Sequence, residues 1–262
     1  MIVELHAVPE AVSLDRLAGV WQIHQLVSGH RFSADDMLTA WMGQRVAPQA
    51  SRLLDLGAGI GSVGLMALWA LQNRDPEAPR ALTMLEAQEV SHRLAVATIA
   101  HNNLQDRASA LLGDMRSFDH GGEVFDLVTG SPPYFPVGTG KISPHPQKAA
   151  CRMELRGTIA DYALAARPVL APDGWFVTCF PARDPRGEAA FAPAGLHVRA
   201  SCDVTFRAGG EAPVVLRLFA AQATPGPRAL GSGITIRAKD GQWTPEYLEL
   251  RAEMGSAMPP VG

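Results

Sequence analysis

The sequence predicts a mixed α/β fold built on a mostly parallel sheet, and three observations support this. Short apolar runs typical of buried strands alternate with apolar-faced helical patterns through the middle of the chain. A glycine-rich loop joins the first of these strands to the first helix. The 262 residues, 47% hydrophobic and 19% charged, have the balance of an ordinary globular chain with a full core.

The elements follow one another as βαβ units, with the right-handed crossover that such units adopt. The last two predicted strands are separated by a turn-rich segment, so we expect them to pair antiparallel at the sheet edge. A turn over residues 171–174 should lead into the strand 175–180, which precedes these two strands in the chain. The expected strands cover 52–56, 81–86, 108–112, 125–129, 175–180, 196–206 and 214–221, and the expected helices cover 61–71, 89–103 and 158–167.

Two segments flank this core. Residues 1–50 are expected to form a helical and loop segment that acts as a lid, and residues 51–221 the α/β domain. Residues 222–262 form a C-terminal extension that we expect to pack on the core. The extension should contain a strand over 234–238 and a short helix that starts near Pro245.

Composition excludes several classes of protein. No apolar run approaches the ~18 residues that span a bilayer, and the first ten residues lack a basic region followed by an apolar one, so we expect a cytoplasmic protein without a membrane segment. The three cysteines, Cys151, Cys179 and Cys202, are widely spaced, which indicates reduced thiols and no metal site. The net charge of −3 argues against a large RNA footprint but allows a local basic patch.

The strongest local signal is the loop Asp55-Leu-Gly-Ala-Gly-Ile-Gly61, directly after a strand and before a helix. Glycines at 57, 59 and 61 let the loop turn tightly and let a ligand approach the backbone. Glu86 ends the next strand, where its carboxylate can accept both hydroxyls of a ribose, and the third strand is followed by Gly113 and Asp114. A nicotinamide dinucleotide fold would share the loop and the acid, so these residues alone do not identify the nucleotide.

Together these residues resemble the class I S-adenosylmethionine-dependent methyltransferases. The resemblance implies a Rossmann-like fold with a seven-stranded, mostly parallel sheet and an antiparallel edge hairpin, and S-adenosyl-L-methionine as cofactor. It further implies that the loop from Asp55, with Gly57, Gly59 and Gly61, wraps the methionine end of the cofactor. Glu86 would then hold the ribose and Asp114 the adenine amino group. The cofactor is a sulfonium cation without phosphates, which agrees with acids rather than a phosphate-binding lysine in the loop.

A second signal is Gly130-Ser131-Pro132-Pro133-Tyr134, directly after the fourth strand. Two consecutive prolines fix the backbone and remove two amide donors, which leaves carbonyl groups as preorganised acceptors. The segment resembles the Asn/Asp-Pro-Pro-Tyr/Phe motif of methyltransferases that act on exocyclic amino groups or side-chain amides. The resemblance implies that Ser131 and Pro132 accept hydrogen bonds from the target nitrogen and that Tyr134 stacks on the substrate. Ser131 departs from the motif, because its hydroxyl is shorter than an asparagine side chain.

A third signal is the segment 29–41, Gly-His-Arg-Phe-Ser-Ala-Asp-Asp-Met-Leu-Thr-Ala-Trp. It resembles the segment that precedes the glycine loop in the bacterial tRNA(Val) adenine-N6 methyltransferases. Ser33 is the expected helix N-cap, with two aspartates in the first turn, where the helix dipole favours acids. The resemblance implies that this helix covers the cofactor, which makes Arg31, Phe32 and Asp36 candidate lid residues.

The segment 135–156 follows the double proline and is rich in glycine, proline and basic residues. Long loops of this kind are often lids or binding loops, although such a cluster can also be a solvated loop without a role. We expect substrate contacts from Phe135, Lys141, Lys148 and Arg152. Glu154 and Arg156 are either an ordered pair that holds the segment or exposed charges.

The sequence therefore predicts an S-adenosylmethionine-dependent N-methyltransferase whose target is adenine N6 of RNA, with tRNA as partner. Three alternatives remain open at this stage: methylation of a protein glutamine or a small amine, cofactor binding without turnover caused by Ser131, and a nicotinamide dehydrogenase. Loss of the proton from the product ammonium to water needs no general base, so we assign no catalytic histidine.

Overall fold

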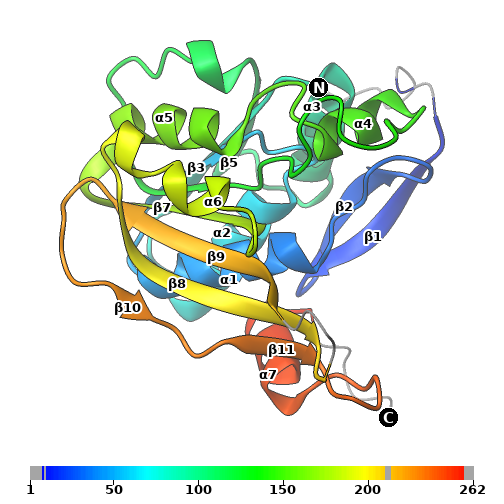
Figure 1. Ribbon diagram of the computed structural model, residues 1–262. Helices are drawn as coiled ribbons and strands as arrows, with labels where there is room; N and C mark the ends of the chain where they lie inside the picture. The colour runs from blue at the N-terminus through cyan, green and yellow to red at the C-terminus, as the bar shows by residue number, and fades with distance from the viewer. Residues whose placement is uncertain (1–7, 9, 210–213, 257–262) are drawn as a thin grey trace.

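The computed structural model describes residues 8, 10–209 and 214–256. Its main sheet has the strand order β10-β8-β9-β7-β6-β3-β4-β5, with β11 also paired to β8 (Figure 1). The strands are β3 (Arg52–Leu56), β4 (Ala81–Glu86), β5 (Ala108–Leu112), β6 (Phe125–Gly130), β7 (Leu170–Pro181), β8 (His197–Arg207), β9 (Val214–Gln222), β10 (Ala229–Leu230) and β11 (Ile234–Arg237).

The seven expected strands are all present in this sheet. Strands β5, β4, β3, β6 and β7 are parallel neighbours, and β9 runs antiparallel to both β7 and β8. The Rossmann-like fold of the class I methyltransferases is therefore confirmed, with β10 and β11 as two short additions parallel to β8. Residues 208–213, the expected turn between β8 and β9, lie partly outside the described residues.

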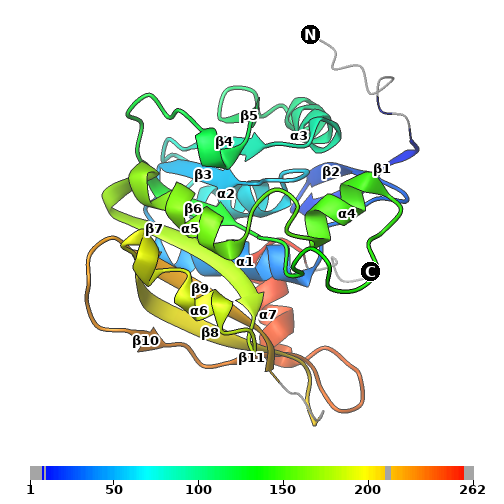
Figure 2. The ribbon, with the colours of Figure 1, turned by 45° about the horizontal axis from the view of Figure 1, so that its top comes forward.

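Helices cover both faces of the sheet (Figures 1 and 2). Leu53, on β3, packs in a core cluster with α1, α2 and α3, whereas the next residue, Leu54, packs in a second cluster with α5 on the opposite face. This alternation follows from the pleat of a strand buried on both faces. The helices are α1 (Ala34–Val46), α2 (Ser62–Arg74), α3 (Glu89–His101), α4 (Pro146–Arg152), α5 (Ile159–Val169), α6 (Arg186–Ala189) and α7 (Pro245–Glu253).

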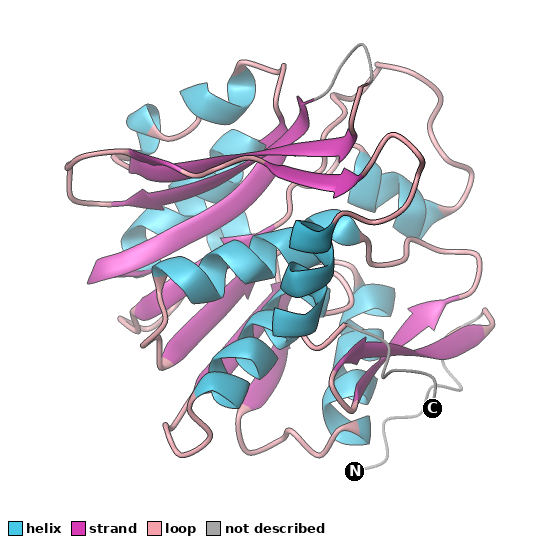
Figure 3. Cartoon of the chain, turned by 90° about the horizontal axis from the view of Figure 1, so that it is seen from below, coloured by secondary structure: helices cyan, strands magenta, loops and turns pink. Residues whose placement is uncertain are grey.

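The N-terminal segment differs from the expectation of helix and loop. Strands β1 (Val12–Ala18) and β2 (Trp21–Leu26) form an antiparallel hairpin, which Figure 3 shows as a separate pair of strands beside the main sheet. Gly19 permits the tight turn because its φ is +56°. The hairpin is fixed by α3, where the Thr98 hydroxyl accepts the His24 amide N–H at 3.0 Å. Such a partner, far away in sequence, is not visible in the local pattern.

Two further expectations are corrected in detail. The residues of the expected turn 171–174 lie inside β7 as a pairing irregularity, because Phe125 pairs with Leu170 but Leu127 pairs with Trp175. The segment 135–156 is not a loop throughout, since it contains α4, with His145 as its N-cap. No helix among the described residues is long and apolar enough to cross a membrane.

A buried and an exposed leucine on opposite faces of the sheet should differ in how much replacement by alanine destabilises the protein. Leu65 on α2 is fully buried, whereas Leu164 on α5 is 55% exposed. We expect Leu65→Ala to lower the free energy of unfolding by about 2–5 kcal/mol and Leu164→Ala by less than about 1 kcal/mol. Urea denaturation of the two variants measures this. Equal losses in both would contradict the described placement of α2 and α5.

Candidate active site

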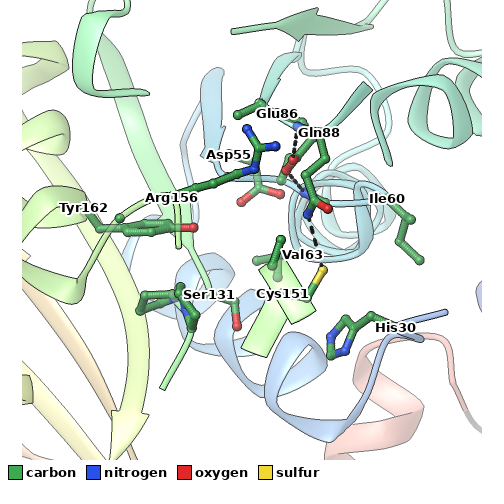
Figure 4. A pocket seen from close by; sticks show the side chains of 18 of the residues that line it. His30, Asp55, Ile60, Val63, Glu86, Gln88, Ser131, Cys151, Arg156 and Tyr162 are labelled. Carbon is green, nitrogen blue, oxygen red and sulfur yellow. Dashed lines mark hydrogen bonds between the residues drawn. The ribbon is translucent and has the colours of Figure 1, made fainter. Parts of the chain in front are cut away.

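A pocket lies at the carboxyl ends of β3, β4 and β6 (Figure 4). Parallel strands bring their carboxyl ends to one edge, which is where ligands bind in open α/β sheets. The pocket therefore joins signals that are well separated in the sequence. The candidate residues that line it are Phe32, Asp36, Asp55, Gly57, Gly59, Glu86, Asp114, Ser131, Pro132, Pro133, Tyr134, Phe135 and Arg152.

The Asp55 carboxylate connects three elements of this site. It accepts the Thr129 hydroxyl of β6 at 2.7 Å and the Gly64 amide N–H of α2 at 3.0 Å. Burial raises the pKa of Asp55 to about 6, because it disfavours the charged form more than the two hydrogen bonds favour it. This acid therefore holds the glycine loop against the strand that leads into the double-proline segment.

Glu86 lies at the end of β4 beside the glycine loop. One of its carboxylate oxygens accepts the Gly59 amide N–H at 2.7 Å and the other accepts the Gln88 amide N–H at 2.6 Å. A carboxylate has about four lone-pair positions, so acceptor capacity is left for a ligand in the pocket. Burial raises the pKa of Glu86. At Gly59 the φ is +57° and an added Cβ would meet no atom within 4 Å, so the loop leaves open space beside this carboxylate.

Tyr162 closes the other side of the glycine loop from α5. A Cβ added at Gly57 would lie 2.1 Å from the Tyr162 hydroxyl oxygen, and Gly57 has a φ of +58°. Glycine is therefore required at this position on both steric and backbone grounds. Asp114 also lines the pocket, with its carboxylate accepting the Arg116 Nε–H at 2.9 Å.

The double-proline segment is held from below by side-chain contacts. The Tyr134 hydroxyl donates to an Asp35 carboxylate oxygen at 2.8 Å and lies 3.2 Å from the Cys179 sulfur. The Tyr134 ring meets the Phe180 ring edge to face, with centroids 5.7 Å apart. The Ser131 hydroxyl lies 3.7 Å from the same Cys179 sulfur, a weak contact that leaves it free to bond elsewhere.

Several expected site residues lie elsewhere. Arg31 is not among the described lining residues; it pairs with Asp15 of β1 at 2.8 Å, because the hairpin that the sequence did not reveal offers it a carboxylate. Gly61 caps α2 with a φ of +90° and does not line the pocket itself. Lys141 and Lys148 also lie outside the described lining.

The expected helix start is present, and its two aspartates have different partners. Ser33 is the N-cap of α1, and the Asp36 carboxylate accepts the Ser33 amide N–H at 3.0 Å. The pKa of Asp36 is raised, first by burial and then by the neighbouring Asp35. Asp36 is thus a capping residue that also lines the pocket, while Asp35 supports Tyr134.

Glu154 and Arg156 do not form the expected pair with each other, and of the two only Arg156 is exposed, as the second alternative expected. The Glu154 carboxylate is buried and pairs with Arg186 at 2.6 Å, whereas Arg156 lines the pocket near Glu86. Sequence analysis also missed other lining residues that Figure 4 displays. Gln88 could have been found from its place two residues after Glu86 at a strand-to-helix junction, and His30 from its place in the segment 29–41. No residue-specific signal marks Cys151 and Tyr162.

The residues present fit S-adenosylmethionine. The carboxylates of Asp55, Glu86 and Asp114 line the pocket together with the open backbone at Gly59, which suits a cationic ligand that carries a ribose. No lysine occurs among the described lining residues. The described part of the chain contains no group of three or more His, Cys, Asp or Glu side chains placed to hold a metal ion.

Solved structures share the fold. The chain aligns with a predicted O-methyltransferase from Agrobacterium tumefaciens with a TM-score of 0.59 and 18% identity, covering 87% of this chain and 100% of that one. It aligns with the tRNA m1G37 methyltransferase of M. jannaschii with a TM-score of 0.55 and 12% identity, covering 83% of this chain and 58% of that one. No family model matches the chain.

The fold, the site and the relatives define an S-adenosylmethionine-dependent methyltransferase. The resemblance to the bacterial tRNA(Val) enzymes is also confirmed by curated relatives. A tRNA1(Val) (adenine(37)-N6)-methyltransferase from Actinobacillus pleuropneumoniae is 28% identical over 76% of this chain and 80% of its own length. One from Pasteurella multocida is 26% identical over 82% of this chain and 84% of its own length.

We expect S-adenosylmethionine to bind more tightly as the pH rises through about 6. The pKa of Asp55 is raised to about 6, and a bound cation favours the ionised form, so binding below this pH must displace a proton. The dissociation constant should fall by up to about tenfold per pH unit below 6 and level off above it. Isothermal titration calorimetry between about pH 5 and 7.5 measures this.

The Asp55→Asn variant is the control, because Glu86 and Asp36 also have raised pKa values. It should bind more weakly at neutral pH and show a flatter pH dependence than the wild type. An identical pH dependence in both proteins would show that Asp55 is not the group linked to binding.

Proposed function

We propose that the protein transfers the methyl group of S-adenosylmethionine to N6 of an adenine in RNA, with tRNA as the substrate. The observation that carries the proposal is that Ser131 to Tyr134 line the same pocket as Asp55 and Glu86. An amino-methylation segment and a cofactor site thus share one cavity. The printed activity of the relatives, on adenine 37 of tRNA1(Val), supports the choice of base and of RNA.

The acceptor groups suit an exocyclic amine. The lone pair of an adenine N6 is conjugated with the ring, and hydrogen bonds from its two N–H groups to fixed acceptors favour a more pyramidal and more nucleophilic nitrogen. We assign the Pro132 carbonyl and the Ser131 hydroxyl as these acceptors. The cofactor supplies the electrophilic methyl group. The methylated ammonium is acidic enough to release its extra proton to water, so no side chain needs to act as a base.

The remaining side chains divide between the two ligands. We assign Asp36, Asp55, Gly57, Gly59, Glu86 and Asp114 to the cofactor, as the resemblance implies. Phe135 is 44% exposed and the Arg152 guanidinium carbon lies 5.8 Å from the centre of its ring. This pair forms a platform for a base drawn out of an RNA loop, since unpaired bases stack on aromatic rings and guanidinium planes. Lys141 and Lys148, outside the pocket, are assigned to phosphate contacts.

The proposed function is tested with purified protein, radiolabelled S-adenosylmethionine and two transcripts of a valine tRNA, one with adenine and one with guanine at the target position. The expected result is label in the adenine transcript only, recovered as N6-methyladenosine after digestion. Label in no RNA but in a protein glutamine would favour the alternative substrate. Cofactor binding without turnover, with turnover gained in Ser131→Asn, would show that the natural Ser131 is inactive.

Two variants of Tyr134 separate the roles of its ring and its hydroxyl. Tyr134→Phe keeps the ring but loses the bonds to Asp35 and Cys179, so we expect methyl transfer to fall by less than about tenfold. Tyr134→Ala removes the ring as well, and we expect a loss of about 100-fold or more in kcat. The affinity for S-adenosylmethionine should change little in either. Equal activity of the two variants in a methyl-transfer assay would contradict a role for the ring.

A further inference from the structure

A groove separate from the methyl-transfer pocket lies between the N-terminal hairpin, the start of α1, the ends of β8 and β11, and α7. It has a volume of about 700 Å³. Four arginines line it, and no acidic residue occurs among the described residues of its lining. The arginines are Arg16, Arg207, Arg237 and Arg251. The groove thus gathers four positive charges in a chain whose net charge is −3.

These arginines differ from others in the molecule. Arg186 and Arg217, for example, pair with carboxylates of neighbouring residues. Within residues 8, 10–209 and 214–256, no salt bridge joins any of the four groove arginines to an acid. Their charges are therefore available to an anionic partner.

Three of the four groove arginines are nevertheless held in place. The Arg251 guanidinium carbon lies 4.0 Å from the centre of the Trp243 ring, and that of Arg237 lies 5.6 Å from it. Arg237 also donates to the Gly241 carbonyl at 2.8 Å, and Arg16 donates to the Gly19 carbonyl at 3.1 Å. Stacking and neutral carbonyl contacts orient these side chains without neutralising them. Less side-chain entropy is therefore lost when an anion binds.

The groove lies beside the methyl-transfer pocket. Phe32 lines both cavities. Arg207 and Arg237 are register partners in the parallel pair β8 and β11. They therefore lie near the carboxyl ends of strands that run parallel to β6 and β7, at the same edge of the sheet as the pocket. Figures 1 and 2 show β11 and α7 at the end of the sheet beside β8.

We propose that this groove binds the sugar-phosphate backbone of the RNA next to the target adenine. The identity of the anion as RNA rests on the proposed function. The choice of this groove as the binding site rests on charge complementarity between its arginines and a polyanion. An RNA strand presents regularly spaced phosphates, and fixed guanidinium groups bind phosphates through charge-assisted hydrogen bonds. The C-terminal extension, which supplies Arg237, Trp243 and Arg251, thereby becomes an RNA-binding element of the enzyme.

The test is the binding of a fluorescently labelled tRNA transcript to the full chain, measured by anisotropy between about 50 and 200 mM salt. The variant Arg207→Gln/Arg237→Gln removes two groove charges at exposed positions. We expect it to weaken binding by about tenfold and to lower the slope of log affinity against log salt by about 1.5. Calorimetry should show unchanged S-adenosylmethionine binding, which verifies the fold.

The matched control is Arg93→Gln/Arg107→Gln, which removes two charges near α3 and β5, away from the groove. It should leave RNA affinity within about twofold of the wild type. Equal losses in both double variants would overturn the proposal, because the effect would then reflect net charge alone. Competition by polyglutamate as effective as that by RNA of equal charge would assign the groove to acidic polypeptides and would also overturn it.

The groove and the proposed function can fail separately. RNA binding that depends on Arg207 and Arg237, without methyl transfer to adenine, would contradict the proposed function but support the groove as an RNA-binding site. Methyl transfer to adenine with unchanged RNA affinity in Arg207→Gln/Arg237→Gln would support the proposed function but contradict the groove as an RNA-binding site.

Discussion

The active site depends on one buried carboxylate. Asp55 accepts a hydroxyl from Thr129 on β6 and an amide N–H from Gly64 on α2, and it stands at the start of the glycine loop. Ser131 follows Thr129 by two residues, so the hydrogen bond between Thr129 and Asp55 fixes the double-proline segment relative to the glycine loop. Isolation from water makes this carboxylate costly to ionise, and a cationic ligand would offset that cost. One buried carboxylate thus fixes the geometry of the site and also suits a cationic ligand.

The parts of the site that the sequence predicts are those with local causes. Glycines such as Gly57, next to Tyr162, are required by backbone angle and close approach, and Glu86 ends a strand whose apolar run is plain. Parallel pairing then brings these signals to one edge. The parts that could not be predicted depend on partners distant in the chain. The resemblance places Arg31 in the lid, whereas its partner in the structure is Asp15, on a hairpin with weak alternation. Arg156 lines the pocket, and Glu154 pairs with Arg186 instead.

Net charge is a poor guide to the partner of this protein. The chain is acidic overall, and many of its arginines are neutralised by neighbouring carboxylates, as Arg186 and Arg217 are. Four arginines without a described salt bridge gather in one groove beside the methyl-transfer pocket, where Trp243 orients two of them. Local fields act over about a Debye length, so such a cluster can attract a polyanion whatever the sum over the molecule. If the groove binds RNA as proposed, the groove and the double-proline segment together determine the choice of substrate.

We conclude that Asp55 couples β6, the strand that leads into the double-proline segment, to the glycine loop. A double-mutant cycle tests this coupling directly. The dissociation constant for S-adenosylmethionine is measured for the wild type, Thr129→Val, Asp55→Asn and the double variant. If the account is right, Thr129→Val weakens binding several-fold in the wild type and has little effect in Asp55→Asn, a coupling of about 1 kcal/mol. An equal effect of Thr129→Val in both backgrounds would contradict it.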